Sequence, residues 1–415
     1  MIRISSKYTL IALIVLTILI RLAVMFGGAT YVNPFTDEFE EIANNILAGK
    51  GFAVTYVGTT YRNYEEPLYV WITAGVYLLT DHSKAAMLLV QILFSVVLVC
   101  SVYFIAQDIF NQRTANLAGF LVAFHPSLVY FSVAKLEYTV FSAMLASLCI
   151  LATLNFYKNR SMRYAFYLGL LFGFGILGRG AVVIFAVCSL LWLGAKRILT
   201  KKTLFVIILT TFVIMLPWTI RNYIVYGKVM LLKTNAPGFW YGNNENSIGT
   251  GHGAGGVNLI DSASEDFKSK FIGKDETEQD RFLMEEGKKF VLNHPEKALG
   301  LFVKKIFYFW WFPPVICLNY PQVFFSLYRA YYIFIILFAI AGLIYAFADK
   351  GFNNKAKCSL LLMYFLFLTL LHAVYYVEGR HRWTIEPLIL IFTAYGILEL
   401  KKKFPKLSQV RIWIK

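Results

Sequence analysis

The sequence contains few cysteines, and none is placed to form a recognisable metal or disulfide pattern. The five cysteines are scattered, and four of them lie within apolar segments: Cys100, Cys149, Cys188, Cys317 and Cys358. No pair has the short spacing typical of zinc ligands, and no regular set of spacings indicates a disulfide framework. We therefore expect neither a disulfide-stabilised fold nor a zinc site.

No removable signal peptide is evident in the sequence either. The first apolar segment, residues 8–26, is long enough to cross a membrane, and no small-residue cleavage pattern follows it. We expect this segment to remain in the protein as its first span.

Charged residues, and acidic ones above all, are scarce. They make up 15% of the chain, with 24 Asp and Glu against 40 Lys and Arg and a net charge of +16. No nucleic-acid-binding module accompanies this excess, so we do not expect nucleic acid as a partner. Hydrophobic residues reach 58% and the mean hydropathy is +0.59, which is typical of a polytopic membrane protein.

Apolar runs of about 20 residues predict an all-α membrane protein with roughly ten spans. The predicted spans are 8–26, 85–107, 116–131, 138–157, 164–178, 181–193, 204–220, 328–347, 359–376 and 383–398. Two shorter apolar stretches, 67–80 and 302–312, predict helices at the membrane surface.

This pattern divides the chain into three parts. Residues 1–220 form a transmembrane module with a long first outer loop at 27–84, residues 221–326 a mostly polar external region with an interfacial helix, and residues 327–415 the last spans. With these spans all six short basic loops fall on one side, which the positive-inside rule assigns to the cytoplasm together with both termini. Every unusual polar cluster then lies on the outer side.

The segment at 33–52 has the densest group of acids. Asp37, Glu38, Glu40 and Glu41 are followed by apolar residues at helical spacing, which predicts a short amphipathic helix on the membrane. Acids at the start of a helix are also favoured by the helix dipole, so a solvated acidic turn is the alternative. Carboxylates at a water–lipid boundary are suited to general-base catalysis.

Several isolated charged residues lie in the predicted outer turns. They are Lys135, Glu137, Arg179, Arg221, Arg380 and Arg382. Ionisable groups at membrane depth are energetically costly, so a functional role is the default hypothesis for them. The alternative is that each extends to the lipid headgroups or secures the end of its helix. Because guanidinium binds phosphate bidentately, arginines converging on one face indicate a phosphate or pyrophosphate site.

A glycine-rich loop covers residues 235–256. It contains Trp240 and Tyr241, which are suited to stacking on a sugar, followed by Asn243 and Asn244. The loop lacks the lysine pattern and the strand–helix context of a nucleotide-binding loop. A plain mobile loop is the alternative interpretation.

The motifs resemble one family across nearly the whole chain. They are D-E-F-E-E-I-A-N-N-I-L-A-G-K-G-F (37–52), E-P-L-Y-V-W (66–71), P-S-L-V-Y-F-S-V-A-K-L-E (126–137), G-I-L-G-R (175–179), P-W-T-I-R-N-Y (217–223), G-N-N (242–244), N-H-P (293–295) and R-H-R-W-T-I-E-P (380–387). In this order they resemble the polyprenyl-phosphate-sugar-dependent membrane glycosyltransferases of the C-type (GT-C) fold. These include dolichyl-phosphate-mannose protein mannosyltransferases and the lipid A aminoarabinose transferase, and the chain looks most similar to their bacterial members.

The resemblance implies roles at matching positions. Asp37 matches the catalytic acid of the first outer loop, and Glu137 matches the acid of the second. The resemblance places Arg179 and Arg380 near the lipid phosphate, and we add Arg382, Arg221 and Lys135 to that group. Candidates for contacts with the acceptor or the sugar are Glu38, Glu66, Tyr69, Trp240, Tyr241, Asn243 and Asn244. No cofactor is certain, and a divalent metal ion held by Asp37 and Glu137 stays open.

The expected activity is an inverting sugar transfer from undecaprenyl or dolichyl phosphate to an acceptor hydroxyl on a glycan, lipid or protein. Asp37 would act as the base, and the arginines would stabilise the departing phosphate. The expected location is the bacterial inner membrane, with the site on its outer face. A lipid-linked-sugar transporter would show related halves, and no internal repeat is visible. A non-catalytic envelope assembly protein would tolerate the loss of Asp37.

Overall fold

The computed structural model describes the chain apart from residues 1–5, 57, 234, 316–319 and 405–415. Six of the described helices are long and apolar enough to cross a membrane. They are α1 (Ser6–Gly27), α4 (Lys84–Ile109), α7 (Thr139–Asn159), α10 (Lys201–Tyr226), α15 (Gln322–Ala348) and α16 (Lys355–Val374). All six overlap predicted spans, so the chain is an integral membrane protein with several spans.

Shorter helices complete the bundle. They are α5 (Gln112–Ala123), α6 (Pro126–Phe131), α8 (Met162–Gly178), α9 (Val182–Ala195), α17 (Gly379–Trp383) and α18 (Glu386–Lys403). The prediction of one continuous span over 116–131 is wrong, because the helix stops before His125 and restarts at Pro126. A proline inside a helix would remove a backbone hydrogen bond and clash with the preceding turn. The exact number of crossings stays a prediction.

Small residues let some helices approach each other closely. A Cβ added at Gly342 of α15 would lie 2.0 Å from the Phe392 carbonyl oxygen of α18. A Cβ added at Gly396 of α18 would lie 2.1 Å from the Phe338 carbonyl oxygen of α15. The two backbones are therefore in contact, which is a common packing mode in membranes.

Other elements gather at one end of the bundle and beside it. The helices are α2 (Glu38–Leu47), α3 (Pro67–Thr80), α11 (Ala236–Gly242), α12 (Glu265–Phe271), α13 (Glu276–Asn293), α14 (Pro295–Trp310) and the 3₁₀ turn η1 (Ala254–Gly256). The strands are β1 (Phe35–Thr36), β2 (Val54–Tyr56), β3 (Thr59–Tyr61) and β4 (Lys135–Leu136). β2 and β3 pair antiparallel, and β1 and β4 pair parallel. These short strands were not predicted, so the fold is predominantly rather than purely helical.

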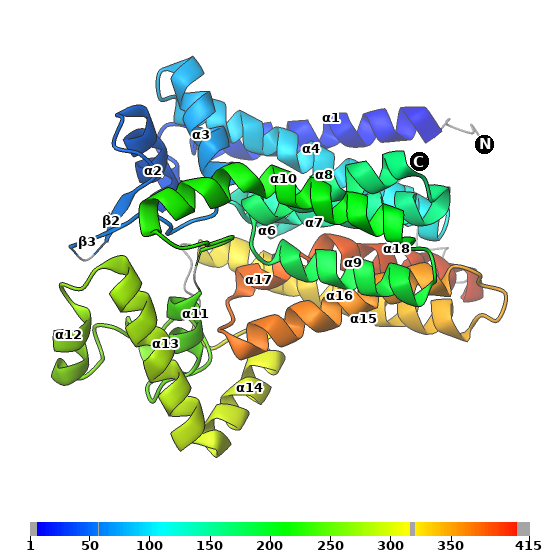
Figure 1. Cartoon of the computed structure of the whole chain (residues 1–415). Helices are drawn as coiled ribbons and strands as arrows, with labels where there is room; N and C mark the ends of the chain where they lie inside the picture. The colour runs from blue at the N-terminus through cyan, green and yellow to red at the C-terminus, as the bar shows by residue number, and fades with distance from the viewer. Residues whose placement is uncertain (1–5, 57, 234, 316–319, 405–415) are drawn as a thin grey trace.

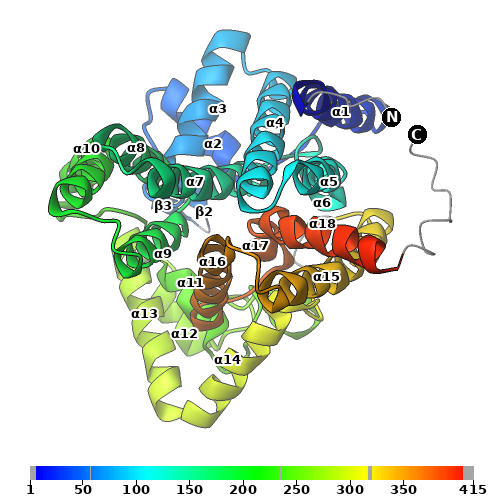
Figure 2. The same cartoon turned by 90° about the vertical axis from the view of Figure 1, so that its right-hand side faces the viewer.

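The bundle has two different ends. Figure 1 shows α2, β2, β3 and α12 at one end, with the start of α1 and the finish of α18 at the other. Figure 2 looks onto the end of the bundle where α1 starts and α18 finishes. The ends of α4, α9 and α16 that adjoin predicted basic loops meet there. Lys357 Nζ lies 2.8 Å from Asp108 Oδ2, and Trp192 Nε1 donates to the Ala356 carbonyl. This grouping agrees with the predicted segregation of basic loops, whereas the orientation in the cell stays a prediction.

The four described cysteines are free: Cys100, Cys149, Cys188 and Cys358. Cys317 lies outside the described residues.

Candidate active site

A two-residue parallel β pair brings the two predicted catalytic acids together. In it Phe35 faces Lys135 and Thr36 faces Leu136, so Asp37 and Glu137 follow side by side. Asp37 is the N-cap residue of α2, yet its side chain makes no capping hydrogen bond. Its Oδ2 instead lies 2.8 Å from Lys135 Nζ, which also lies 3.5 Å from Glu137 Oε2. Lys135 is thus a cation between two carboxylates.

Gln91 of α4 holds the segment around β4, which carries Lys135 and Glu137, in place. Its Nε2 donates to the Ser132 and Lys135 carbonyls at 3.1 and 2.9 Å. Its Oε1 accepts from the Glu137 backbone N–H at 3.3 Å and from the Tyr69 hydroxyl at 2.7 Å. Tyr69 is therefore buried behind this segment and not placed to contact a substrate. Gln91 was missed because a lone glutamine inside an apolar helix has no local motif.

The two acids differ in access. The Asp37 side chain is 27% exposed, whereas that of Glu137 is 1% exposed. Glu137 Oε1 accepts a short hydrogen bond from the Thr139 hydroxyl, and Oε2 lies 3.6 Å from Arg380 Nη1. Burial opposes the charge on Lys135, but Glu137 and Asp37 raise its pKa overall. Asp37 is hence the acid that an external molecule can reach, and Glu137 stabilises the cations beside it.

Asp37, Lys135 and Arg380 line a cavity of about 710 Å³, whereas Glu137 lies behind its lining. Its charged lining residues are Asp37, Glu38, Glu65, Glu66, Lys135, Arg179, Lys233, Glu276, Asp280 and Arg380. Apolar side chains also line it, among them Val183 and Ile184 of α9 and Leu371 of α16, together with Leu232, Ile260, Phe271 and Leu283 from other elements. The lining thus carries both charged and apolar side chains, which suits a ligand with both characters.

A second ion cluster on the cavity lining contains Glu65, Glu66, Arg179 and Lys233. Lys233 Nζ lies 2.9 Å from Glu65 Oε2 and 3.5 Å from Glu66 Oε2, while Arg179 Nη1 lies 3.7 Å from Glu66 Oε2. The Gly180 backbone N–H donates to Glu66 Oε1 at 3.0 Å. Burial raises the pKa of Glu66, but Lys233 and Arg179 outweigh it and hold that pKa at about 2. For Glu65 burial is the larger influence, and its pKa is raised.

Lys233 was missed by the sequence reasoning. It lies in the connection after α10, among residues that look like an ordinary polar loop. The only available signal was the Glu65–Glu66 pair, since two adjacent carboxylates next to an apolar helix call for a cation nearby.

Arg179 and Arg380 have hydrogen-bonding capacity left over. The Arg179 guanidinium carbon lies 4.1 Å from the centre of the Tyr138 ring, and Arg380 Nε lies 2.8 Å from Glu378 Oε2. Within the described part of the chain, neither guanidinium makes a hydrogen bond of good geometry, and Arg380 Nε is buried without one. Their side chains are only 19% and 20% exposed. Two largely buried cations with unused donors in one cavity point to an anionic ligand.

The predicted phosphate ligand Arg382 lies elsewhere. Its Nε and Nη2 donate to Glu386 Oε1 and the Tyr328 hydroxyl, both at 2.6 Å. Its Nη1 donates to the Phe309 and Trp311 carbonyls. The remaining Glu386 oxygen, Oε2, lies 2.6 Å from His125 Nε2. Arg382 does not line the cavity, because all its polar nitrogens are used inside the bundle.

Arg221 does not line the cavity either. Its guanidinium donates to the Arg62 and Phe52 carbonyls at 2.7 and 3.0 Å. It also lies 4.8 Å from the Trp218 ring. It therefore ties the end of α10 to the first outer loop, which is the helix-end role named above as the alternative.

The glycine-rich loop contributes one predicted residue to the cavity. Tyr241 lines it. Trp240 is buried and stacks on Phe267 at 4.8 Å. The Asn243 and Asn244 amides donate to backbone carbonyls, including those of Val374 and Trp240. These three residues hold the loop together and are not brought to the cavity.

His372 and His381 are further cavity residues that the sequence did not single out. Their rings stack at 4.1 Å. Burial lowers the pKa of His381, and the neighbouring His372 and Arg380 lower it further. The pair lies beside Arg380 on the cavity lining.

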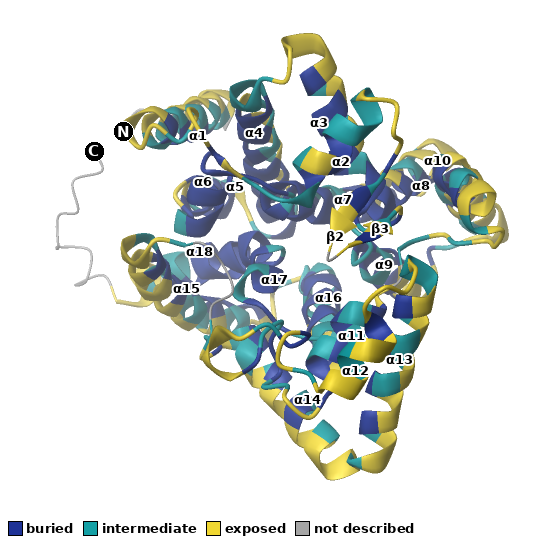
Figure 3. Cartoon of the chain, turned by 90° about the vertical axis from the view of Figure 1, so that its left-hand side faces the viewer, coloured by how far each residue is buried: buried dark blue, intermediate teal, exposed yellow. Residues whose placement is uncertain are grey.

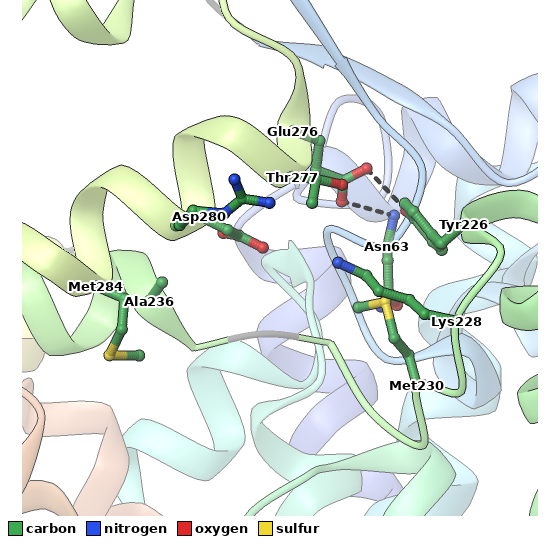
Figure 4. Close-up of a pocket in the computed structure, with 10 residues that line it drawn as sticks. Asn63, Tyr226, Lys228, Met230, Ala236, Glu276, Thr277, Asp280 and Met284 are labelled. Atoms are coloured by element: carbon green, nitrogen blue, oxygen red, sulfur yellow. Dashed lines mark hydrogen bonds between the residues drawn. The ribbon is translucent and has the colours of Figure 1, made fainter.

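A smaller pocket of about 230 Å³ adjoins the cavity and shares Asn63, Glu276 and Asp280 with it. Figure 4 shows the Glu276 carboxylate joined by dashed lines to Tyr226 and Asn63. Its carboxylate accepts from the Tyr226 hydroxyl at 2.7 Å and from the Asn63 N–H at 3.1 Å. This carboxylate links α13 to α10 and to the first outer loop.

The arrangement does not fit a divalent ion held by Asp37 and Glu137. The Lys135 ammonium already lies between their carboxylates. Among the residues that the structure describes, no three His, Cys, Asp or Glu side chains are grouped to hold a metal. We therefore derive no step through a metal.

Comparison with known proteins agrees with the motifs. Residues 65–220 match the family described as Dolichyl-phosphate-mannose-protein mannosyltransferase. No curated protein sequence matches the chain.

Among solved structures, the Archaeoglobus fulgidus oligosaccharyltransferase in the apo form has 12% identity and a TM-score of 0.59 over 97% of this chain and 52% of that one. The same organism's AglB, in complex with an inhibitory peptide and a dolichol-phosphate, has 14% identity and a TM-score of 0.56, over 97% of this chain and 52% of that one. ArnT from Cupriavidus metallidurans, bound to undecaprenyl phosphate, has 14% identity and a TM-score of 0.44, over 95% of this chain and 80% of that one. This chain spans about half the length of the oligosaccharyltransferase chains, with which it shares its fold.

Proposed function

We propose that this chain, which has the fold of the C-type (GT-C) membrane glycosyltransferases, transfers a sugar from a polyprenyl phosphate to an acceptor hydroxyl with inversion. The observation that carries the proposal is the β1–β4 pair. It places the accessible Asp37 carboxylate beside Lys135 and Glu137, on the lining of the cavity that Arg179 and Arg380 also line. Phosphate is a good leaving group, so the reaction needs a base and cations rather than a strong acid.

Asp37 is the proposed base. Its carboxylate takes the proton of the acceptor hydroxyl as the acceptor oxygen forms its bond to the anomeric carbon. The bond from that carbon to the phosphate oxygen breaks, and the electron pair leaves with the lipid phosphate. Lys135, whose pKa is raised, keeps a positive charge 2.8 Å from the Asp37 carboxylate.

Arg179 and Arg380 are the proposed phosphate ligands. Their unused donors would bind the oxygens on which negative charge grows as the bond breaks. Lys233 is a third cation on the same lining, although Glu65 and Glu66 occupy it in the structure described here. Glu137 has a positioning role, since it is buried between Lys135 and Arg380.

Apolar side chains in the cavity lining suit the lipid of the donor. They include Val183 and Ile184 of α9 and Leu371 of α16, and α16 is apolar enough to span the membrane. The dolichol-phosphate in the similar AglB structure supports a polyprenyl phosphate as the ligand here. The inhibitory peptide in that complex leaves a protein among the candidate acceptors, beside glycans and lipids.

Mass spectrometry of lipid-linked sugars and envelope glycans tests the proposal. Cells without the gene should accumulate one polyprenyl-phosphate sugar on the outer face and lose one glycan modification. The parent gene should reverse both changes, and a gene encoding Asp37→Asn should reverse neither. Accumulation on the inner face would indicate a transporter, and full reversal by Asp37→Asn would indicate a non-catalytic assembly protein.

We place the cavity on the outer face of the bacterial inner membrane and both termini in the cytoplasm, because the basic loops gather at the opposite end. A cysteine at Ser264, the N-cap residue of α12, should react with an impermeant thiol reagent in intact cells. Reaction only after permeabilisation would reverse the assignment.

A further inference from the structure

Helix α14 has an apolar stripe that nothing described covers. Leu299, Val303 and Phe307 are spaced four residues apart and are 65%, 58% and 58% exposed. At this spacing their side chains lie on one face of the helix. The opposite face, with Leu301, Lys305 and Phe309, is buried. α14 is thus a two-faced helix whose outer face is apolar beyond its first turn, where the exposed Glu296 lies.

Two lysines border the stripe. Lys297 and Lys304 are exposed, are seven residues apart and so lie along one edge of the helix. Within the described part of the chain neither forms an ion pair. An apolar stripe bordered by free lysines is typical of a helix that lies at a membrane surface containing anionic lipids.

The position of α14 fits such a surface. Figure 3, viewed from the end of the bundle with α2 and α12, shows α13 and α14 along their lengths and α4 and α16 nearly end-on. α14 therefore runs across the bundle axis and projects beyond its side. Its last turn meets spanning helices, since Trp310 Nε1 donates to the Thr369 hydroxyl and the Tyr332 hydroxyl donates to the Trp310 carbonyl.

We propose that α13 and α14 form an arm that lies on the membrane, with the stripe of α14 in the lipid and Lys297 and Lys304 on anionic headgroups. The partner is a lipid surface rather than another protein, because the stripe continues directly into contacts with helices that span the membrane. This inference does not depend on sugar transfer, and its test needs no substrate.

The arm is connected to the cavity. Lys305 Nζ donates to the Gly242 and Tyr375 carbonyls at 3.1 and 3.0 Å and to Asn243 Oδ1 at 3.1 Å. Tyr375 lines the cavity, and Phe309 stacks at 5.6 Å on the cavity residue His372. Seating of the arm on lipid therefore fixes one side of the cavity lining at membrane level.

Fluorescence quenching in vesicles of phosphatidylethanolamine and phosphatidylglycerol tests the arm. Val303→Cys, labelled with an environment-sensitive fluorophore, should be quenched by nitroxide-bearing lipid and protected from iodide. Lys288→Cys on the polar helix α13 is the matched control, and iodide should quench it. The parent protein, treated in the same way, gives the background from its own cysteines. Lys297→Glu with Lys304→Glu should weaken seating about fivefold per lysine, and omission of phosphatidylglycerol should act in the same direction.

Two outcomes would overturn the inference. Equal quenching by iodide at positions 303 and 288 would mean that the stripe faces water. Protection of position 303 from both quenchers, with disulfide-linked dimers in vesicles and in detergent, would assign the stripe to a second copy of the chain.

Discussion

Helix α17 contributes arginines to two different charged groups. Arg382 lies in a network whose donors and acceptors are matched, with Glu386, Tyr328 and two backbone carbonyls. Arg380, two residues earlier, lies in the cavity with no well-formed hydrogen bond among the described residues. Both arginines are largely shielded from solvent, with side chains 1% (Arg382) and 20% (Arg380) exposed. What separates a structural role from a ligand-binding one is therefore the fraction of hydrogen-bonding capacity already used, not burial.

The largest expected effect is the loss of the matched network. Arg382→Met should destabilise the protein by about 3–5 kcal/mol, because Glu386 would remain as a buried charge without its partner. Thermal unfolding of the purified protein in detergent measures this loss. Arg380→Met is the control and should destabilise it much less, since Arg380 is partly exposed and Glu137 keeps Lys135. Equal destabilisation by both variants would remove the distinction between the two groups.

The next effect concerns the accessible acid of the cavity. Asp37→Asn should reduce sugar transfer by about 100-fold or more while expression stays near normal, because the amide cannot accept the proton. Asp37→Glu should recover little, since one methylene displaces the carboxylate from its in-line position. Transfer assays on membranes from a strain lacking the gene measure both.

Glu40→Gln is the matched control for Asp37. It removes a carboxylate from the same helix, but Glu40 contacts Lys84 at 3.1 Å and the Tyr77 hydroxyl at 3.2 Å, outside the cavity lining. Its transfer should stay close to that of the parent. An inactive Glu40→Gln with an active Asp37→Asn would show that the base is misassigned.

The cavity arginines should show an intermediate effect. Arg179→Ala and Arg380→Ala should each weaken donor use by roughly 10- to 100-fold, the range of a hydrogen bond to a charged group. Arg179→Lys should restore only part of the donor use, because an ammonium keeps the charge but cannot bind phosphate bidentately. Full activity of both alanine variants would remove these residues from the proposed phosphate site.

The sequence was sufficient for the class of fold. Long apolar runs predicted the membrane spans, because length and hydropathy are local properties. It also singled out Asp37, Glu137, Arg179 and Arg380, which the structure brings to or beside one cavity, while their roles stay predictions. The break at Pro126 was missed although the proline was visible, since hydropathy does not change across it.

The rest depended on partners distant in the sequence. Arg380 and Arg382 lie two residues apart in one motif, and the contact that assigns Arg382 to the network is with Tyr328, 54 residues earlier. Trp240 looked like a sugar platform, but Phe267 covers it. Lys233 was overlooked because its meaning comes from Glu65 and Glu66, more than 160 residues away.

The last prediction separates the two adjacent carboxylates of the cavity. The pKa of Glu66 is held at about 2, below its unfolded value, so Glu66 contributes stability that is complete above that unfolded value. Glu66→Gln should therefore lower stability near neutral pH by on the order of 3 kcal/mol or less. The difference between parent and variant should shrink by up to about 1.4 kcal/mol per pH unit as pH falls below roughly 4.3. Unfolding midpoints in detergent, measured from neutral pH downward, give this slope. Glu65→Gln is the matched control: because the pKa of Glu65 is raised, its removal should leave stability unchanged or increased near neutral pH. Equal losses in the two variants, or a Glu66→Gln difference independent of pH, would contradict the assignment of the cationic partners to Glu66.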